Sequence, residues 1–124
     1  MNTLLIFLGA GLGGVLRFWT SQAVYFLLGR QFPYGTLVVN VTGSFAMGFL
    51  FILIAERVGE IAPQLRSLLL IGVLGGYTTF SSFSVETMSL IENGAWTSAV
   101  LNIVMNVILC LAATWIGLEL GRQL

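Results

Sequence analysis

The sequence contains no histidine, no lysine and no aspartate. Five arginines and five glutamates carry all of its side-chain charge over 124 residues, and its net charge is zero. These absences leave no nucleophile–base set, so an enzyme is not expected. Without an excess of positive charge there is no basic patch for nucleic acid. The single cysteine, Cys110, cannot form a disulfide within the chain.

Apolar residues dominate what is present. The chain is 57% hydrophobic and 8% charged, which indicates an integral membrane protein. Helices close their own backbone hydrogen bonds in lipid, so the expected fold is all-α. The apolar segments cover residues 3–28, 34–55, 66–91 and 96–120. Each has the roughly 20 residues that a helix needs to span a bilayer. We therefore predict one four-helix transmembrane domain over residues 1–124.

Two features of the chain concern its insertion into the membrane. The N-terminus lacks the positive region and cleavage site of a signal peptide, so we expect it to begin the first span. Four spans place both termini on one side, with Arg57, Arg66 and Arg122, and leave Arg30 on the other. Orientation follows this arginine bias. The small bias allows either one orientation with the termini inside or insertion in both orientations.

The third apolar segment contains a stretch that a simple membrane span would not need. Residues 75–84 include two adjacent glycines, five serines or threonines and three aromatic residues. Glycine is a poor helix former, and hydroxyl side chains compete for backbone hydrogen bonds. We predict a helix broken near the membrane midplane. Unwound backbone at that depth is tolerated inside protein or beside water, where its carbonyl groups can bind a cation.

Polar residues in the first two segments have two interpretations each. Arg17 lies inside the first apolar run and either reaches the membrane interface or lines a pore vestibule. Thr36 and Asn40 are four residues apart and share one helix face. The Asn40 amide either bonds a neighbouring helix or faces a translocating anion.

A polar stripe runs along the fourth segment. It consists of Ser98, Asn102, Asn106, Cys110 and Thr114, which are spaced four residues apart. Such a stripe is costly against lipid, so it must meet another helix or water. Interhelical hydrogen bonding is one explanation, and we favour a pore-lining track because the stripe is long and neutral.

The residues after the predicted break complete a possible anion path. Phe80 and Phe83 form an aromatic face of one helical turn, and Ser81 and Ser84 form a hydroxyl face beside it. Ring edges carry partial positive charge, and neutral donors hold an anion without trapping it. Glu86 follows and marks either the end of a pathway or the interface. The pattern favours an anion channel.

Three motifs in this chain are similar to those of one known family. They are GAGLGGVLRF at residues 9–18, GTLVVNVTGSFAMG at 35–48 and GVLGGYTTFSSFS at 72–84. The chain resembles the Fluc (CrcB-type) fluoride channels of bacteria over all four spans. That resemblance implies an antiparallel, dual-topology homodimer in the bacterial inner membrane. Two pores per dimer would export fluoride passively and reduce its toxicity in the cytoplasm.

The resemblance also implies roles for individual residues. Phe80 and Phe83 would be the pore phenylalanines and Asn40 the essential asparagine, with Thr36 near the same path. Backbone carbonyls of Gly75 and Thr78 from both subunits would hold a structural sodium ion at the dimer centre. The fourth-segment stripe falls on the family's polar track, which is usually richer in serine, threonine and tyrosine.

Two other functions are compatible with a chain of this size. Small proton-coupled multidrug exporters also have four spans and dual topology, but they depend on a glutamate in the first span. Here that span carries Arg17 instead, and Glu86 is the only candidate carboxylate. A non-transporting membrane subunit is the third possibility, and the polar residues within the spans argue against it.

Overall fold

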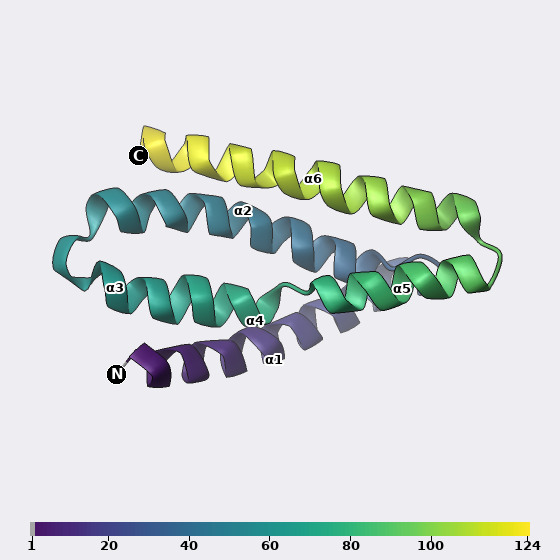
Figure 1. The fold of residues 1–124 in the computed structure, drawn as a ribbon, viewed down its shortest axis with the longest axis horizontal. Coiled ribbons are helices and arrows are strands. Elements are labelled where there is room, and N and C mark those ends of the chain that lie inside the picture. The colour runs from purple at the N-terminus through teal and green to yellow at the C-terminus, as the bar shows by residue number, and fades with distance from the viewer. Residues whose placement is uncertain (1) are drawn as a thin grey trace.

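The structure of this chain is a computed structural model that describes residues 2–124. Over that range all regular structure is helical. The elements are α1 (Asn2–Leu28), α2 (Tyr34–Arg57), η1 (Gly59–Ile61), α3 (Ala62–Leu65), η2 (Arg66–Leu74), α4 (Gly75–Tyr77), α5 (Phe80–Glu92) and α6 (Trp96–Gln123). Both ends of the chain lie at the same end of the bundle (Figure 1).

Four helical stretches are long and apolar enough to cross a membrane: α1, α2, the run Gly59–Glu92 and α6. Four long apolar helical stretches are thereby confirmed as candidate spans, although the third begins before residue 66. Large apolar side chains face outward, as expected against lipid; Phe26 is 89% exposed. Two of the connections contain a glycine with positive φ, Gly29 (φ 88°) and Gly94 (φ 79°). Glycine adopts this left-handed backbone without steric cost, so the helices can end there.

The third span is interrupted at Thr78 and Thr79. Thr78 has φ −83° and ψ 160°, and Thr79 has φ −152° and ψ 116°, so both are extended. The predicted interruption is therefore present, but it follows the glycine pair. Gly75 and Gly76 remain helical in α4, at the end of the π-helical stretch η2.

The glycines of the third span are used for close packing against α1. A Cβ atom on Gly76 would lie 2.5 Å from the carbonyl oxygen of Ala10, and one on Gly72 would lie 3.0 Å from the Cα of Gly9. The backbones touch without intervening side chains. These glycines therefore serve contacts within one chain, because α1 and the third span approach too closely there for any larger residue.

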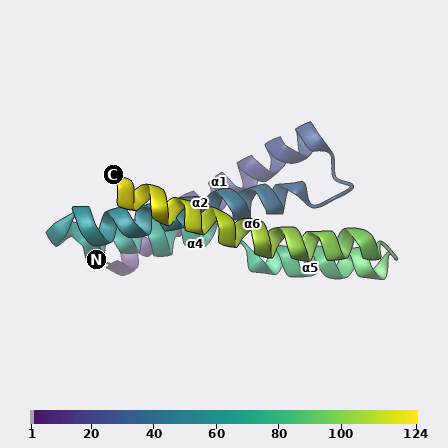
Figure 2. The same cartoon turned by 90° about the horizontal axis from the view of Figure 1, so that it is seen from above.

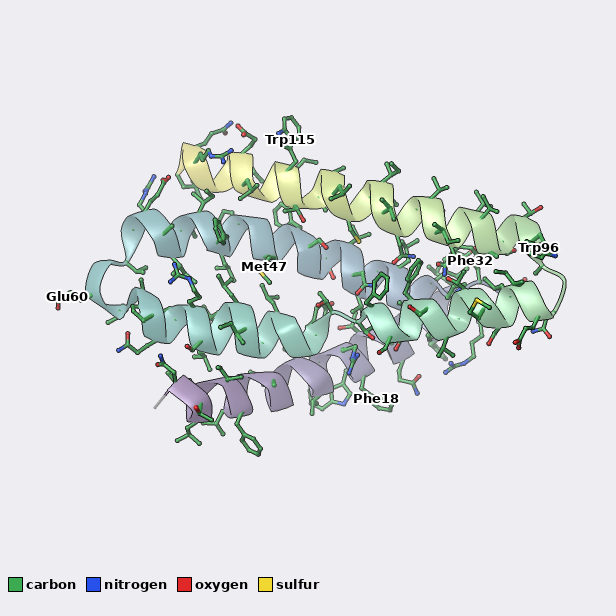
Figure 3. All side chains as sticks on the ribbon, viewed as in Figure 1. Phe18, Phe32, Met47, Glu60, Trp96 and Trp115 are labelled. Atoms are coloured by element: carbon green, nitrogen blue, oxygen red, sulfur yellow. The ribbon has the colours of Figure 1, made fainter. Side chains whose placement is uncertain are left out.

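The other helices complete a bundle around a small apolar core. α2 packs along α6, while α1 packs along η2 and α4. Ile54, Leu70 and Leu74 form the buried centre, with Met47 packed against them between α2 and the third span (Figure 3). Seen from above, α1 diverges from α5 and α6 toward the end opposite the termini (Figure 2). Polar residues of α2 and α6 lie outside this core, beside the break in the third span.

The glycine contact predicts how the fold responds to one added methyl group. We expect Gly76→Ala to lower the free energy of unfolding by about 1–3 kcal/mol, the usual cost of overpacking. Gly14→Ala is the matched control, because nothing lies within 4 Å of the position its Cβ would take. Thermal unfolding of both purified proteins in detergent measures the difference. Equal midpoints for the two variants would show that α1 can move away from α4 at no cost.

Candidate functional site

The Asn40 side chain holds the interrupted backbone of the third span. Its Nδ2 donates to the carbonyl oxygen of Thr79 at 3.0 Å, and its Oδ1 accepts from the Thr79 N–H at 2.8 Å. One amide group thus satisfies both backbone polar groups of an extended residue. This pairing supplies hydrogen bonds that the helix has lost at membrane depth.

Thr79 also begins the next helix. Its hydroxyl oxygen accepts from the backbone N–H of Ser82 at 3.1 Å, which makes Thr79 the N-cap of α5. In a continuous helix, the N–H groups of Thr79 and Ser82 would bond the carbonyls of Gly75 and Thr78. Both N–H groups are engaged elsewhere. The break therefore removes the ordinary helical partners of the Gly75 and Thr78 carbonyls.

A groove of about 420 Å³ opens beside the break. It is lined by Asn40, Gly43, Ser44, Met47, Thr78, Thr79, Phe80, Phe83, Asn106, Val107, Cys110, Leu111 and Thr114. The two phenylalanine rings are tilted by 51°, with centroids 5.3 Å apart. Phe80 is 77% exposed in the single chain. The groove brings together predicted site residues from the second, third and fourth spans.

The polar stripe of α6 is divided between the groove and the protein interior. Asn106, Cys110 and Thr114 line the groove. Thr114 donates to the backbone oxygen of Ser44 at 3.2 Å. Asn102 lies behind the groove with no exposed surface. The stripe therefore shows both features that the sequence left open: part of it lines the groove, and part of it makes contacts between helices.

Thr36 and Glu86 meet at a different place. The Thr36 hydroxyl donates to Oε2 of Glu86 at 3.0 Å. The other carboxylate oxygen, Oε1, is buried and has no hydrogen-bond partner among residues 2–124. Glu86 lines a second cavity, of about 360 Å³, together with Tyr25, Arg30, Gln31, Pro33, Ser89, Leu90 and Asn93. Charged side chains thus lie in the second cavity, whereas every residue that lines the groove is neutral.

Arg30 is the positively charged residue of this second cavity. Its guanidinium group lies 4.7 Å from the centroid of the Tyr25 ring and donates to Gln22 at 3.0 Å. Neither contact neutralises its charge. Of the two residues that the sequence offered for a vestibule, Glu86 lines this second cavity, whereas Arg17, for which the membrane interface was the alternative, lines neither cavity. The sequence analysis used Arg30 only to predict the orientation of the chain in the membrane. Its position in the sequence indicates a loop but gives no sign of the cavity that Arg30 lines.

The two predicted hydroxyl residues of α5 are not among the residues that line the groove. Ser84 donates to the Phe80 carbonyl at 3.0 Å, and the Ser81 hydroxyl lies 3.3 Å from that of Thr79. Sequence reasoning did not single out Thr79 or Thr87. A threonine just before an apolar helical run is a recognisable N-cap signal for Thr79. Thr87 has no such signal, since its role depends on a contact with α6.

Comparison with known proteins gives a consistent result. A family profile described as "CrcB-like protein, Camphor Resistance (CrcB)" matches residues 4–118. A protein of Coxiella burnetii (strain Dugway 5J108-111), named fluoride-specific ion channel FluC, is 59% identical over 124 residues and covers 100% of both chains. A protein of the same name from Magnetococcus marinus is 49% identical over 115 residues, 93% of each chain. A third, from Methylococcus capsulatus, is 50% identical over 96% of this chain and 52% of its own length.

The position of Cys110 on the groove is directly testable, because the chain has one cysteine. We expect a small methanethiosulfonate reagent to label it in the folded protein, since thiols react where water and reagent reach them. The control protein carries Cys110→Ser and Ala113→Cys, which moves the thiol to a buried position of the same helix. Mass spectrometry measures the labelling rates. Equal rates at the two positions would contradict the exposure of Cys110 to the groove.

Proposed function

The chain belongs to the CrcB-like family, and on that premise we propose that it is a fluoride-selective channel, passive and without enzymatic activity. It is a multi-pass protein of a bacterial membrane. Its role is to let fluoride leave the cell down its electrochemical gradient, which limits the toxic fluoride concentration in the cytoplasm. The relatives that carry the name of a fluoride-specific channel match it over nearly its whole length.

The neutral groove is the observation that carries this proposal. Amide, hydroxyl and thiol groups line the groove together with two phenylalanine rings. Neutral donors and ring edges attract a small anion without the deep binding that a full positive charge would impose. Fluoride is a compact and strong hydrogen-bond acceptor. A narrow path of such donors therefore favours fluoride over larger halides.

We propose that two antiparallel copies close the path. In one chain the groove is open on one side, and Phe80 projects from it with 77% of its surface exposed. A second copy would cover this ring and complete the wall, which gives two pores per dimer. The small imbalance of arginines between the two ends, three against one, supports insertion in both orientations.

A structural sodium ion is part of the same proposal. The carbonyls of Gly75 and Thr78 are hard oxygen donors, and the N–H groups that would ordinarily bond them are engaged by Asn40 and by the Thr79 hydroxyl. Such carbonyls suit a monovalent cation at a broken membrane helix. Two from each chain would hold the ion where the copies meet. Bound there, sodium would be coordinated by four carbonyls that have lost their helical partners.

The second cavity would form a mouth of the path. Thr36 and Glu86 lie between it and the groove-lining Asn40, which is one helical turn from Thr36. Arg30 is positive and raises the local concentration of anions near the Glu86 carboxylate. Arg17 stays a proposed vestibule residue on α1, Ser81 and Ser84 stay proposed residues of the path, and the buried Asn102 supports the lining from behind.

Fluoride efflux from liposomes tests the proposal. We expect the purified protein to release fluoride and to exclude chloride, as followed with ion-selective electrodes. Phe80→Ile and Asn40→Asp should each reduce the fluoride rate about tenfold or more. Phe80→Ile removes a positive ring edge, and Asn40→Asp replaces a donor to the anion, worth about 1.5–3 kcal/mol, with a carboxylate that repels it.

Phe51→Ile is the matched control for the ring substitution. Phe51 is 50% exposed on α2 and does not line the groove, so its loss should leave the rate unchanged. Unaltered efflux in both groove variants would refute the site. Absence of fluoride efflux from the unmodified protein would refute the function itself.

The dimer makes a separate prediction about insertion. A tag at the C-terminus should be accessible from both sides of the bacterial membrane in comparable amounts, because antiparallel partners require both orientations. Protease protection in spheroplasts and in inverted vesicles measures the two populations. A tag found on one side alone would exclude the antiparallel dimer while leaving fluoride transport open.

A further inference from the structure

Three asparagine side chains form a directional chain of hydrogen bonds behind the groove. Asn40 Nδ2 donates to Asn106 Oδ1 at 3.3 Å, and Asn106 Nδ2 donates to Asn102 Oδ1 at 3.0 Å. Asn102 Nδ2 donates to the Thr87 hydroxyl at 2.9 Å, which donates in turn to the Phe83 carbonyl at 2.7 Å. Asn102, Asn106 and Thr87 are 0%, 6% and 6% exposed. Every amide in the chain points the same way.

Backbone groups at the two ends fix this direction. At one end the Thr79 N–H can only donate, so Asn40 must turn its oxygen toward Thr79 and its NH₂ toward Asn106. At the other end the Phe83 carbonyl can only accept, so Thr87 must offer a lone pair to Asn102. The two constraints agree. Reversing any one amide would place donor against donor in a buried site.

The longest link of the chain lies in the groove. Asn40 and Asn106 both line it, and their 3.3 Å contact is longer than the three links that follow. Asn106 holds its own oxygen in this place because its NH₂ is bound twice to Asn102, once to the side chain and once to the backbone oxygen at 2.9 Å. The weakest bond of the network is therefore the one an anion can reach.

From this geometry we infer that the Asn106 oxygen occupies the position on the Asn40 N–H that the anion takes when it binds. Asn102 and Thr87 are positioning residues that hold the Asn106 oxygen in that position. This inference rests on the proposed function. An anion must displace a neutral amide oxygen to bind, so only a strong hydrogen-bond acceptor gains by the exchange. The Asn106 oxygen also keeps binding weak enough for the anion to leave.

Loss of the Thr87 hydroxyl should release this constraint. In Thr87→Val, Asn102 loses its acceptor and its side chain can turn, so the Asn106 NH₂ keeps only the bond to the Asn102 backbone oxygen and can turn toward an anion in the groove. Two donors would then converge on one anion. We expect the fluoride concentration that gives half-maximal flux to fall about 2- to 10-fold, the value of one added hydrogen bond, while the maximal flux falls because fluoride leaves more slowly.

Two further variants separate positioning from a merely structural role. Thr87→Ser keeps the hydroxyl and should retain the unmodified concentration dependence. Asn102→Leu has a similar shape, removes the relay and should behave as Thr87→Val does. A structural defect would lower flux at every concentration without shifting the half-maximal point. An unshifted point in both Thr87→Val and Asn102→Leu, or the same shift in Thr87→Ser, would overturn the inference.

A measurement without transport tests the relay even if the channel function fails. The chain has five asparagines, so selective ¹⁵N labelling gives few side-chain amide signals in NMR. We expect the Asn102 and Asn106 NH₂ protons to exchange slowly with water in the unmodified protein and rapidly in Thr87→Val. Fluoride should shift the Asn40 signal. Slow exchange without fluoride flux would refute the proposed function and keep the relay, and rapid exchange in the unmodified protein would refute the relay.

Discussion

The pairing of the Asn40 amide with the backbone of Thr79 is the interaction on which the site depends. It replaces, at membrane depth, the two helical hydrogen bonds that the N–H and the carbonyl of Thr79 have lost. Without it the third span would either remain continuous or expose unsatisfied backbone groups at a cost of several kcal/mol. Because Asn40 comes from α2, the same contact ties the second span to the third. It also aligns the Asn40 NH₂ with the groove.

The break divides the third span into two parts with different chemistry. Before the break, the Gly75 carbonyl has lost its ordinary helical partner, the Thr79 N–H, which bonds Asn40 instead. After the break, α5 begins and places Phe80 and Phe83 in the groove lining. The glycine contact of α4 with α1 anchors the first part. The proposed backbone cation site and the proposed anion path can therefore lie within one turn of each other, without sharing a side chain.

Buried polar groups in this protein are tolerated because they bond one another. The amides of Asn102 and Asn106 would be expensive to bury alone, yet each finds its partner on a neighbouring residue or helix. All the amides of this network donate in the same direction along the chain, and backbone groups at its two ends fix that direction. This gives a neutral site a defined arrangement of donors and acceptors, which selectivity between anions requires and which no fixed charge in the groove supplies.

The sequence by itself determined four apolar spans and a third helix that must break, because hydrophobicity and local backbone preference depend only on neighbouring residues. The resemblance of its motifs to one family implied that Asn40, Phe80 and Phe83 act together. Only the tertiary structure decided where the break lies, since its partner is 39 residues away in the chain. It also decided that Asn102 lies behind the groove and that Arg30 lies in the second cavity. The orientation of a buried amide depends on donors and acceptors from other helices, and these are brought together only when the chain folds.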